Sequence, residues 1–88
     1  MRRVYKYKLD VRDEQCIVIP GLIQALHVNV QFGSPCLWCL VDDTEPRQLY
    51  RVLTHGTGHG ATDTKGAKYV GTYMLCDSSF VGHVFIKE

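Results

Sequence analysis

Residues 51–73 (RVLTHGTGHGATDTKGAKYVGTY) hold the densest group of side chains that could do chemistry in this sequence. Two of the four histidines, His55 and His59, and five of the eight glycines lie in this segment. Glycines at alternate positions let the backbone adopt positive φ and turn successive N–H groups toward one concavity, an arrangement that binds anions. The segment therefore predicts a site for a phosphate-bearing molecule. The residues predicted to bind this ligand are Arg51, His55, Thr57, Gly58, His59, Lys65, Lys68, Trp38, Tyr73 and His83.

Each residue type in this set has a distinct expected role. The threonine hydroxyls and histidine rings donate hydrogen bonds, the lysines add charge, and Arg51 offers a bidentate guanidinium. Flat faces for a base or ring would come from aromatic side chains of nearby strands, namely Trp38, Tyr50, Tyr69 and Tyr73. The competing interpretation is that the glycines only shape an Ω-loop and that the aromatic residues fill the core. For Trp38 and Tyr69, taken singly, core packing is the favoured alternative.

A zinc site is the second interpretation of the same region. Cys36, Cys39, His55 and His59 follow the spacing C-x2-C…H-x3-H, which resembles a zinc finger. However, the two cysteines fall within an apolar strand, where residues three apart point to opposite faces. The histidines are separated by glycines, which disfavour the helix that a finger requires. We therefore expect no metal site and no cofactor, with buried thiols in place of ligands.

A catalytic site is the third interpretation. His55-Gly56-Thr57 is an H-x-T word of the kind that occurs twice per chain in two-histidine phosphoesterases, where one histidine is the base and the other the acid. The words at His27 and His83 lack the hydroxyl, so a second copy would have to come from another subunit. No catalytic residue is assigned. A binding protein is expected rather than an enzyme, and a histidine-dependent phosphodiesterase remains the alternative.

Length and composition limit the class of protein. The chain has 88 residues, 45% of them hydrophobic and 22% charged, and a formal net charge of +1. These values are typical of one globular domain over residues 1–88, and they give no basic field to attract nucleic acid. We expect a protein without a membrane segment, located in the cytoplasm, with its four cysteines reduced.

Apolar residues alternate with a period of two through most of the chain, which indicates strands. Seven strand-like segments are expected, at residues 4–10, 15–20, 26–32, 36–42, 49–55, 68–76 and 80–88. The predicted fold is all-β, a small antiparallel sandwich or barrel of about seven short strands. Residues 36–42 are apolar on both faces and so are expected to be central, whereas the lysine-bearing residues 4–10 suit a solvated edge. The last strand is expected to expose an edge that could pair with another subunit. Gly71 and Gly82, inside strands, predict close approach of neighbouring groups.

The words SPCLWCLVD, THGTGH, YVGTY and GHVFIKE resemble a family of short phage-encoded proteins of unknown function, over nearly the whole chain and in the same order. Cys36, Trp38, Gly56, Thr57, Gly58, His59, Gly71, Thr72 and His83 match the words of that family. The resemblance implies a phage origin and a location in the host cytoplasm. By analogy with small phage inhibitors, it implies a homo-oligomer that sequesters a nucleotide signal of host immunity. A structural or protein-binding accessory without a ligand is the remaining hypothesis.

Overall fold

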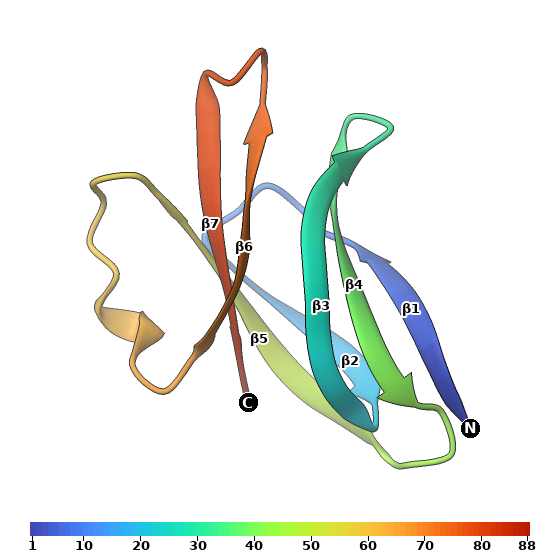
Figure 1. Cartoon of the computed structure of the whole chain (residues 1–88). Coiled ribbons are helices and arrows are strands. Elements are labelled where there is room, and N and C mark those ends of the chain that lie inside the picture. The colour runs from blue at the N-terminus through green and yellow to red at the C-terminus, as the bar shows by residue number, and fades with distance from the viewer.

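Seven antiparallel strands in two sheets form the protein, as seen in a computed structural model that describes residues 1–88 (Figure 1). Its elements are β1 (Arg2–Lys8), β2 (Glu14–Pro20), β3 (Leu22–Gln31), β4 (Ser34–Asp42), β5 (Arg47–Gly56), the 3-10 turn η1 (Thr62–Thr64), β6 (Lys68–Leu75) and β7 (Phe80–Lys87). The sheets pack as a sandwich, so the all-β prediction is confirmed. The structure contains no helix long and apolar enough to cross a membrane.

The order of strands in the two sheets is β1-β4-β3 and β2-β5-β7-β6. The predicted central strand is confirmed, since β4 pairs with β1 on one side and β3 on the other. The basic strand β1 is an edge, also as predicted. The expectation that the last strand is an exposed edge is wrong. β7 forms a hairpin with β6 and also pairs with β5, so hydrogen bonds occupy both of its edges.

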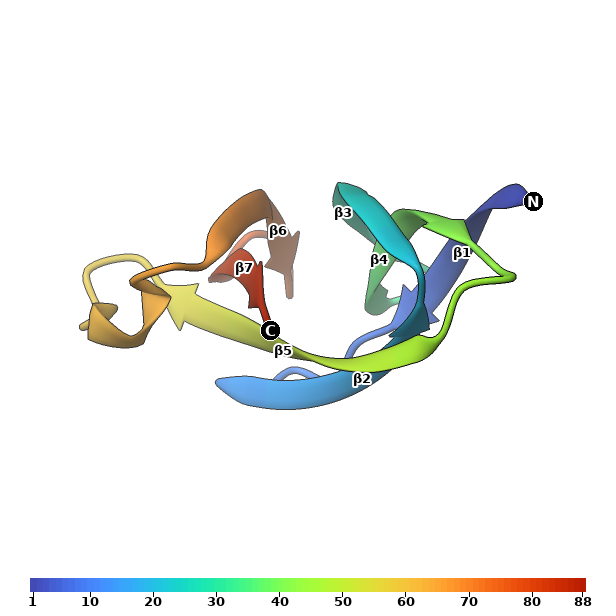
Figure 2. The ribbon, with the colours of Figure 1, turned by 90° about the horizontal axis from the view of Figure 1, so that it is seen from below.

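The core lies between the inner faces of the two sheets. Alternation decides which residues enter it: in β7, Gly82, Val84 and Ile86 are buried, whereas the residues between them are partly exposed. Figure 2 shows β2 and β5 crossing the molecule along one side, with the β3–β4 and β6–β7 hairpins standing opposite them. The buried cluster consists of Leu9, Ile19, Val28, Leu37, Cys39, Val41, Tyr50, Val52, Tyr73, Val84 and Ile86.

Two glycines inside strands allow this close packing, as predicted. A Cβ on Gly71 would lie 2.8 Å from Cγ1 of Val28, because β3 approaches β6 at this point. A Cβ on Gly82 would lie 2.9 Å from the ring of Tyr73 and 3.0 Å from Cγ2 of Thr54. Only a residue without a side chain fits at either position without displacing its neighbours.

The hairpin between β3 and β4 turns through two residues, Phe32 and Gly33. Their φ angles are 52° and 79°, the signs of a type I′ turn, which matches the twist of the flanking strands. Both this tip and the tip of the β6–β7 hairpin project from the same end of the molecule (Figure 1). The opposite ends of β3 and β6 lie near the candidate site described next.

Candidate functional site

The glycine-rich loop between β5 and β6 bonds largely to itself. The amide of His59 donates to the carbonyl of Gly56 (3.1 Å), that of Thr64 to Ala61 (3.2 Å), and that of Ala67 to Thr64 (2.9 Å). Gly58 and Gly66 adopt positive φ, as the sequence predicts for such a loop. Because the amides of His59, Thr64 and Ala67 already have acceptors inside the loop, they do not form the anion-binding concavity that the glycine spacing suggested.

Asp63 fixes the loop on the sheet. Its carboxylate lies 2.7 Å from Nε2 of His55, and its backbone carbonyl accepts a hydrogen bond of 2.7 Å from Nζ of Lys87. The two contacts reach neighbouring strands, β5 and β7. The 3-10 turn is therefore attached to the outer face of the sheet at two points.

A separate chain of hydrogen bonds lies beside the His55–Asp63 pair on the same face. Oγ1 of Thr57 lies 2.7 Å from Nε2 of His83, whose Nδ1 lies 2.9 Å from Oγ1 of Thr72. The same hydroxyl lies 2.6 Å from the phenol oxygen of Tyr69. A neutral imidazole donates at one nitrogen and accepts at the other, so both sides of His83 are satisfied. These residues, with His55 and Asp63, form what we call the histidine network.

His55 and His83 lie directly opposite each other in the pairing of β5 with β7. Directly opposed residues on adjacent antiparallel strands have Cβ atoms about 4.5–5.5 Å apart. The sequence motif that begins at His83 has no threonine two residues later. In the fold, Thr57 of the His55-Gly56-Thr57 motif provides a hydroxyl to His83. Two histidines with hydrogen-bonded partners therefore occupy directly opposed positions on neighbouring strands.

A groove of about 830 Å³ lies between β3 and the start of β6, beside the histidine network. Its lining includes three lysines, Lys65, Lys68 and Lys87, and one acidic residue, Glu88; the ammonium group of Lys87 is hydrogen-bonded to the carbonyl of Asp63. We call it the lysine groove; its other lining residues are Leu22, Ile23, Gln24, Ala25, Tyr50, Gly66, Tyr69, Val70 and Ile86. Apolar walls with a few polar groups and a volume in this range are usual for small-molecule sites.

Tyr69 connects the groove with the histidine network. The residue is 59% exposed, so the preference for core packing at this position is wrong. The hydroxyl is bonded to Thr72, and the ring meets that of Phe85 edge-on with centroids 5.5 Å apart. A side chain held in this way offers a flat face without further loss of rotamer entropy. Deeper in the groove, burial and then the neighbouring Glu88 raise the pKa of Tyr50, so its phenol stays protonated at neutral pH.

The residues predicted from sequence separate into several places. Lys65 and Lys68 line the lysine groove, and His55, Thr57 and His83 belong to the histidine network. Arg51 points along the outer face of β5, with its guanidinium 3.8 Å from the carboxylate of Glu14. The remaining ones are as follows: Gly58 and His59 are exposed in the loop, with the His59 ring above Gly56; Trp38 lies on β4 of the other sheet, beside His27; Tyr73 is buried in the core.

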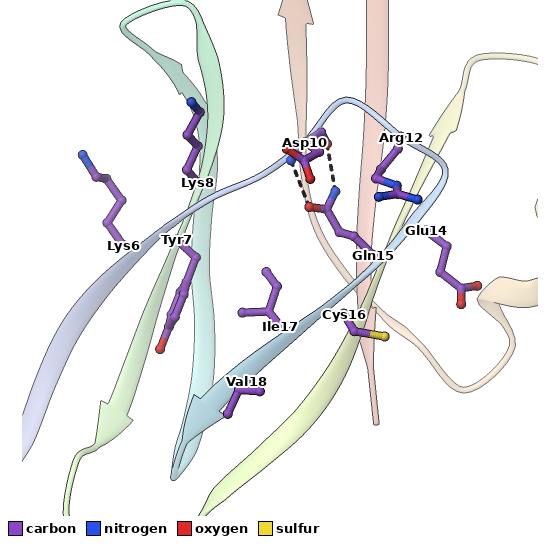
Figure 3. A pocket seen from close by; sticks show the side chains of 10 residues that line it. All are labelled: Lys6, Tyr7, Lys8, Asp10, Arg12, Glu14, Gln15, Cys16, Ile17 and Val18. Atoms are coloured by element: carbon purple, nitrogen blue, oxygen red, sulfur yellow. Dashed lines mark hydrogen bonds between the residues drawn. The ribbon is translucent and has the colours of Figure 1, made fainter.

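A second hollow of about 740 Å³ lies between β1 and β2 (Figure 3). Its charges have both signs, because Lys6, Lys8 and Arg12 share it with Asp10 and Glu14. The Asp10 backbone and the Gln15 side-chain amide are bonded reciprocally across it. Figure 3 shows Lys6 and Lys8 extending away from β2. Mixed charge makes this hollow a poorer match for an anion than the lysine groove.

The cysteine pair is arranged as buried thiols. Cys39 belongs to the core cluster, and Cys36 is buried on the other face of β4, with its thiol 3.6 Å from the carbonyl of Ser34. Burial raises the pKa of Cys39 to about 11, which keeps it protonated. No three His, Cys, Asp or Glu side chains in the structure are grouped to hold a metal ion.

Some groove residues carried no signal that singled them out in the sequence. Lys87 sits in a strand with ordinary alternation, and Gln24 lies in a segment of β3 before its regular pattern begins. Their positions depend on β7 lying beside β5 and β6, and on β3 packing against β6. A reliable strand order would have revealed both residues.

The fold and groove define a small β-sandwich with a lysine-lined groove at the junction of its two sheets. The whole chain, residues 1–88, matches the model of a family described as a domain of unknown function (DUF7352), and the protein belongs to this family. Searches of the curated proteins and of the solved structures found no similar protein.

Proposed function

We propose that this protein binds a phosphate-bearing small molecule in the lysine groove and sequesters it without chemical change. The observation that carries the proposal is that Lys65, Lys68 and Lys87 all belong to the lining of one groove of about 830 Å³. Ammonium groups there would meet phosphate oxygens, and the fixed ring of Tyr69 would stack on a base.

The biological setting extends the same proposal. Relying on the resemblance to short phage-encoded proteins, we place the protein in an infected bacterium, in the host cytoplasm. The ligand would then be a nucleotide signal of host immunity, and its capture an anti-defence activity. The lysines that line the groove support this proposal, and membership of the family does not bear on it.

Heat release of bound ligand tests capture directly. The protein is incubated with a panel of linear and cyclic mono- and dinucleotides and with inorganic phosphate, denatured, and the supernatant is analysed by mass spectrometry. Capture predicts that one compound disappears from solution and returns unaltered on heating. A released product of different mass would make the protein an enzyme, and no depletion of any compound would refute the proposal.

Charge variants locate the site. Each lysine that bonds a phosphate contributes on the order of a 10-fold change in affinity, so the double variant K65Q/K68Q should lose about 100-fold. The matched control K6Q/K8Q removes the same charge from β1 and should bind like the original protein. Calorimetric titration measures both, and an equal loss in the two variants would show only a general charge effect.

The pairing of His55 with His83 supports a second candidate function, hydrolysis of a phosphodiester. Asp63 orients His55 at Nε2, as a carboxylate does for a catalytic base. His83 has threonine hydroxyls on both nitrogens, so the proton-transfer role would fall to His55. In this case the alanine variant at position 55 should abolish turnover but keep ligand binding. Retained cleavage in the His55→Ala and His59→Ala variants would exclude this function.

A homo-oligomer is the remaining part of the proposal. Val18 and Leu49 pair side by side on β2 and β5, and each exposes about half of its surface (51% and 56%). Burying them in another copy would offset the small core of so short a chain. Light scattering should find a molar mass above the 10.0 kDa of one chain, and V18S/L49S should reduce it. A monomer at all concentrations would contradict this part alone.

A further inference from the structure

Phe32 is the most exposed large apolar side chain in the protein. It lies at the tip of the β3–β4 hairpin with 96% of its surface in solvent. The next values among such residues are much lower, for example 66% for Met1 and 59% for Tyr69. Phe32 therefore gains almost nothing from the hydrophobic effect in the isolated chain.

The backbone at Phe32 is also unfavourable for this residue type. Its φ of 52° lies in the left-handed region, where a bulky side chain is an outlier. The first position of a type I′ turn prefers Asn, Asp or Gly, and the second position here is indeed Gly33. A residue that costs stability in its turn and packs against nothing is typical of functional sites, where the compensation comes from a binding partner.

Two lysines of the edge strand β1 lie toward the tip, in a hollow that also contains Asp10 and Glu14. Nζ of Lys6 donates to the side-chain oxygen of Gln31, the residue before Phe32, over 2.7 Å. Lys8 lies on the same edge strand, opposite Cys36 in the pairing of β1 with β4. The lysine groove begins at Leu22, at the other end of β3, so the tip and the groove are separate surfaces.

We propose that Phe32 anchors an interface with a different protein, entering an apolar pocket whose rim carries carboxylates that face Lys6 and Lys8. Exposed aromatic anchors of this kind supply much of the affinity of interfaces. A second copy of this chain is a poorer host, because both hollows described above have more cationic than anionic side chains in their lining. A lipid surface is also disfavoured, since one aromatic ring and two lysines give less than stable membrane anchoring needs.

The first test concerns the turn. F32N places the preferred residue at the first position and should raise the melting temperature by about 4–8 °C, whereas F32A should not. A melting temperature that F32N leaves unchanged or lowers would remove the premise that Phe32 is kept at a cost.

The second test identifies the partner. A photo-crosslinking phenylalanine analogue at position 32 is compared with the same analogue at position 49, in the cells where the protein naturally occurs. We expect a heterologous adduct only from position 32. The purified partner should then bind F32N about 30-fold more weakly than it binds the original protein. It should also bind K6E/K8E more weakly, and its affinity for that variant should depend less on salt concentration.

Several results would overturn the proposal. These are no adduct from position 32, an equal adduct from position 49, an adduct with a second copy of the chain, or a partner that binds F32N normally. Loss of binding to anionic lipid vesicles in F32N would identify a membrane surface instead. K65Q/K68Q should leave partner binding unchanged, so failure of the groove proposal and failure of this one are distinguishable.

Discussion

The hydroxyl of Tyr73 gives the sharpest test of the packing. The side chain is 2% exposed, and its hydroxyl is buried near that of Thr54. Burial raises the pKa of Tyr73 and the nearby Thr54 hydroxyl lowers it, but neither hydroxyl has a hydrogen-bond partner of normal geometry. A buried polar group without a partner costs about 1–3 kcal/mol. Tyr73→Phe removes the hydroxyl and keeps the ring against Gly82, so we expect the free energy of unfolding to rise by about 1 kcal/mol.

Thr54→Val removes the second hydroxyl at nearly constant shape and should have a similar effect. The two side chains converge on Gly82, so the double variant completes a cycle that measures their coupling. Urea unfolding followed by the fluorescence of Trp38, the single tryptophan, gives the values. With a slope of about 2 kcal/mol per molar urea, each midpoint should rise by about 0.5 M. If Tyr73→Phe lowers the free energy of unfolding by about 1 kcal/mol or more, the hydroxyl has a hydrogen-bond partner and the reasoning is refuted.

Three further outcomes are expected. Burial raises the pKa of Tyr73 from its usual 10.0, so the folded state favours the protonated phenol and loses stability as the pH rises above 10.0. Tyr73→Phe removes this titration and should make alkaline unfolding in a pH titration less steep. Gly71→Ala places a Cβ 2.8 Å from Cγ1 of Val28 and should cost about 1–3 kcal/mol in urea unfolding, partly restored by Val28→Ala; an additive double variant would contradict the contact. A thiol reagent at neutral pH should modify Cys16 and Cys76 quickly and Cys39 only after denaturation, and rapid modification of every thiol in the native protein would contradict the assigned burial.

The alternation of apolar residues was sufficient to predict the fold class and all the strands. It also predicted the central position of β4, which pairs with β1 on one edge and with β3 on the other. It could not predict strand order, because a period of two tells which residues share a face and not which strand lies beside it. This is why β7 was expected at an edge and why Trp38 was grouped with residues that lie on the other sheet.

The sequence predicted which residue types the candidate site would contain better than it predicted where they would lie in the fold. The glycines predicted a loop with positive φ angles, which Gly58 and Gly66 confirm. Lys65 and Lys68 line the same groove. The loop amides, however, found acceptors within their own loop, a local competition that glycine spacing does not reveal. The meeting of His55 with His83 depends on the register of β5 and β7, which is set by packing across the whole sheet.

The inner position of β7 has a consequence for biosynthesis. It is the last of the strands to leave the ribosome, yet β6 has no other neighbour in its sheet. Until translation has passed Lys87 and the exit tunnel has released it, β5 and β6 carry unsatisfied edges that invite aggregation. The sheet β2-β5-β7-β6 therefore becomes continuous only when β7 inserts between β5 and β6, in one step that joins the β2–β5 pair to β6.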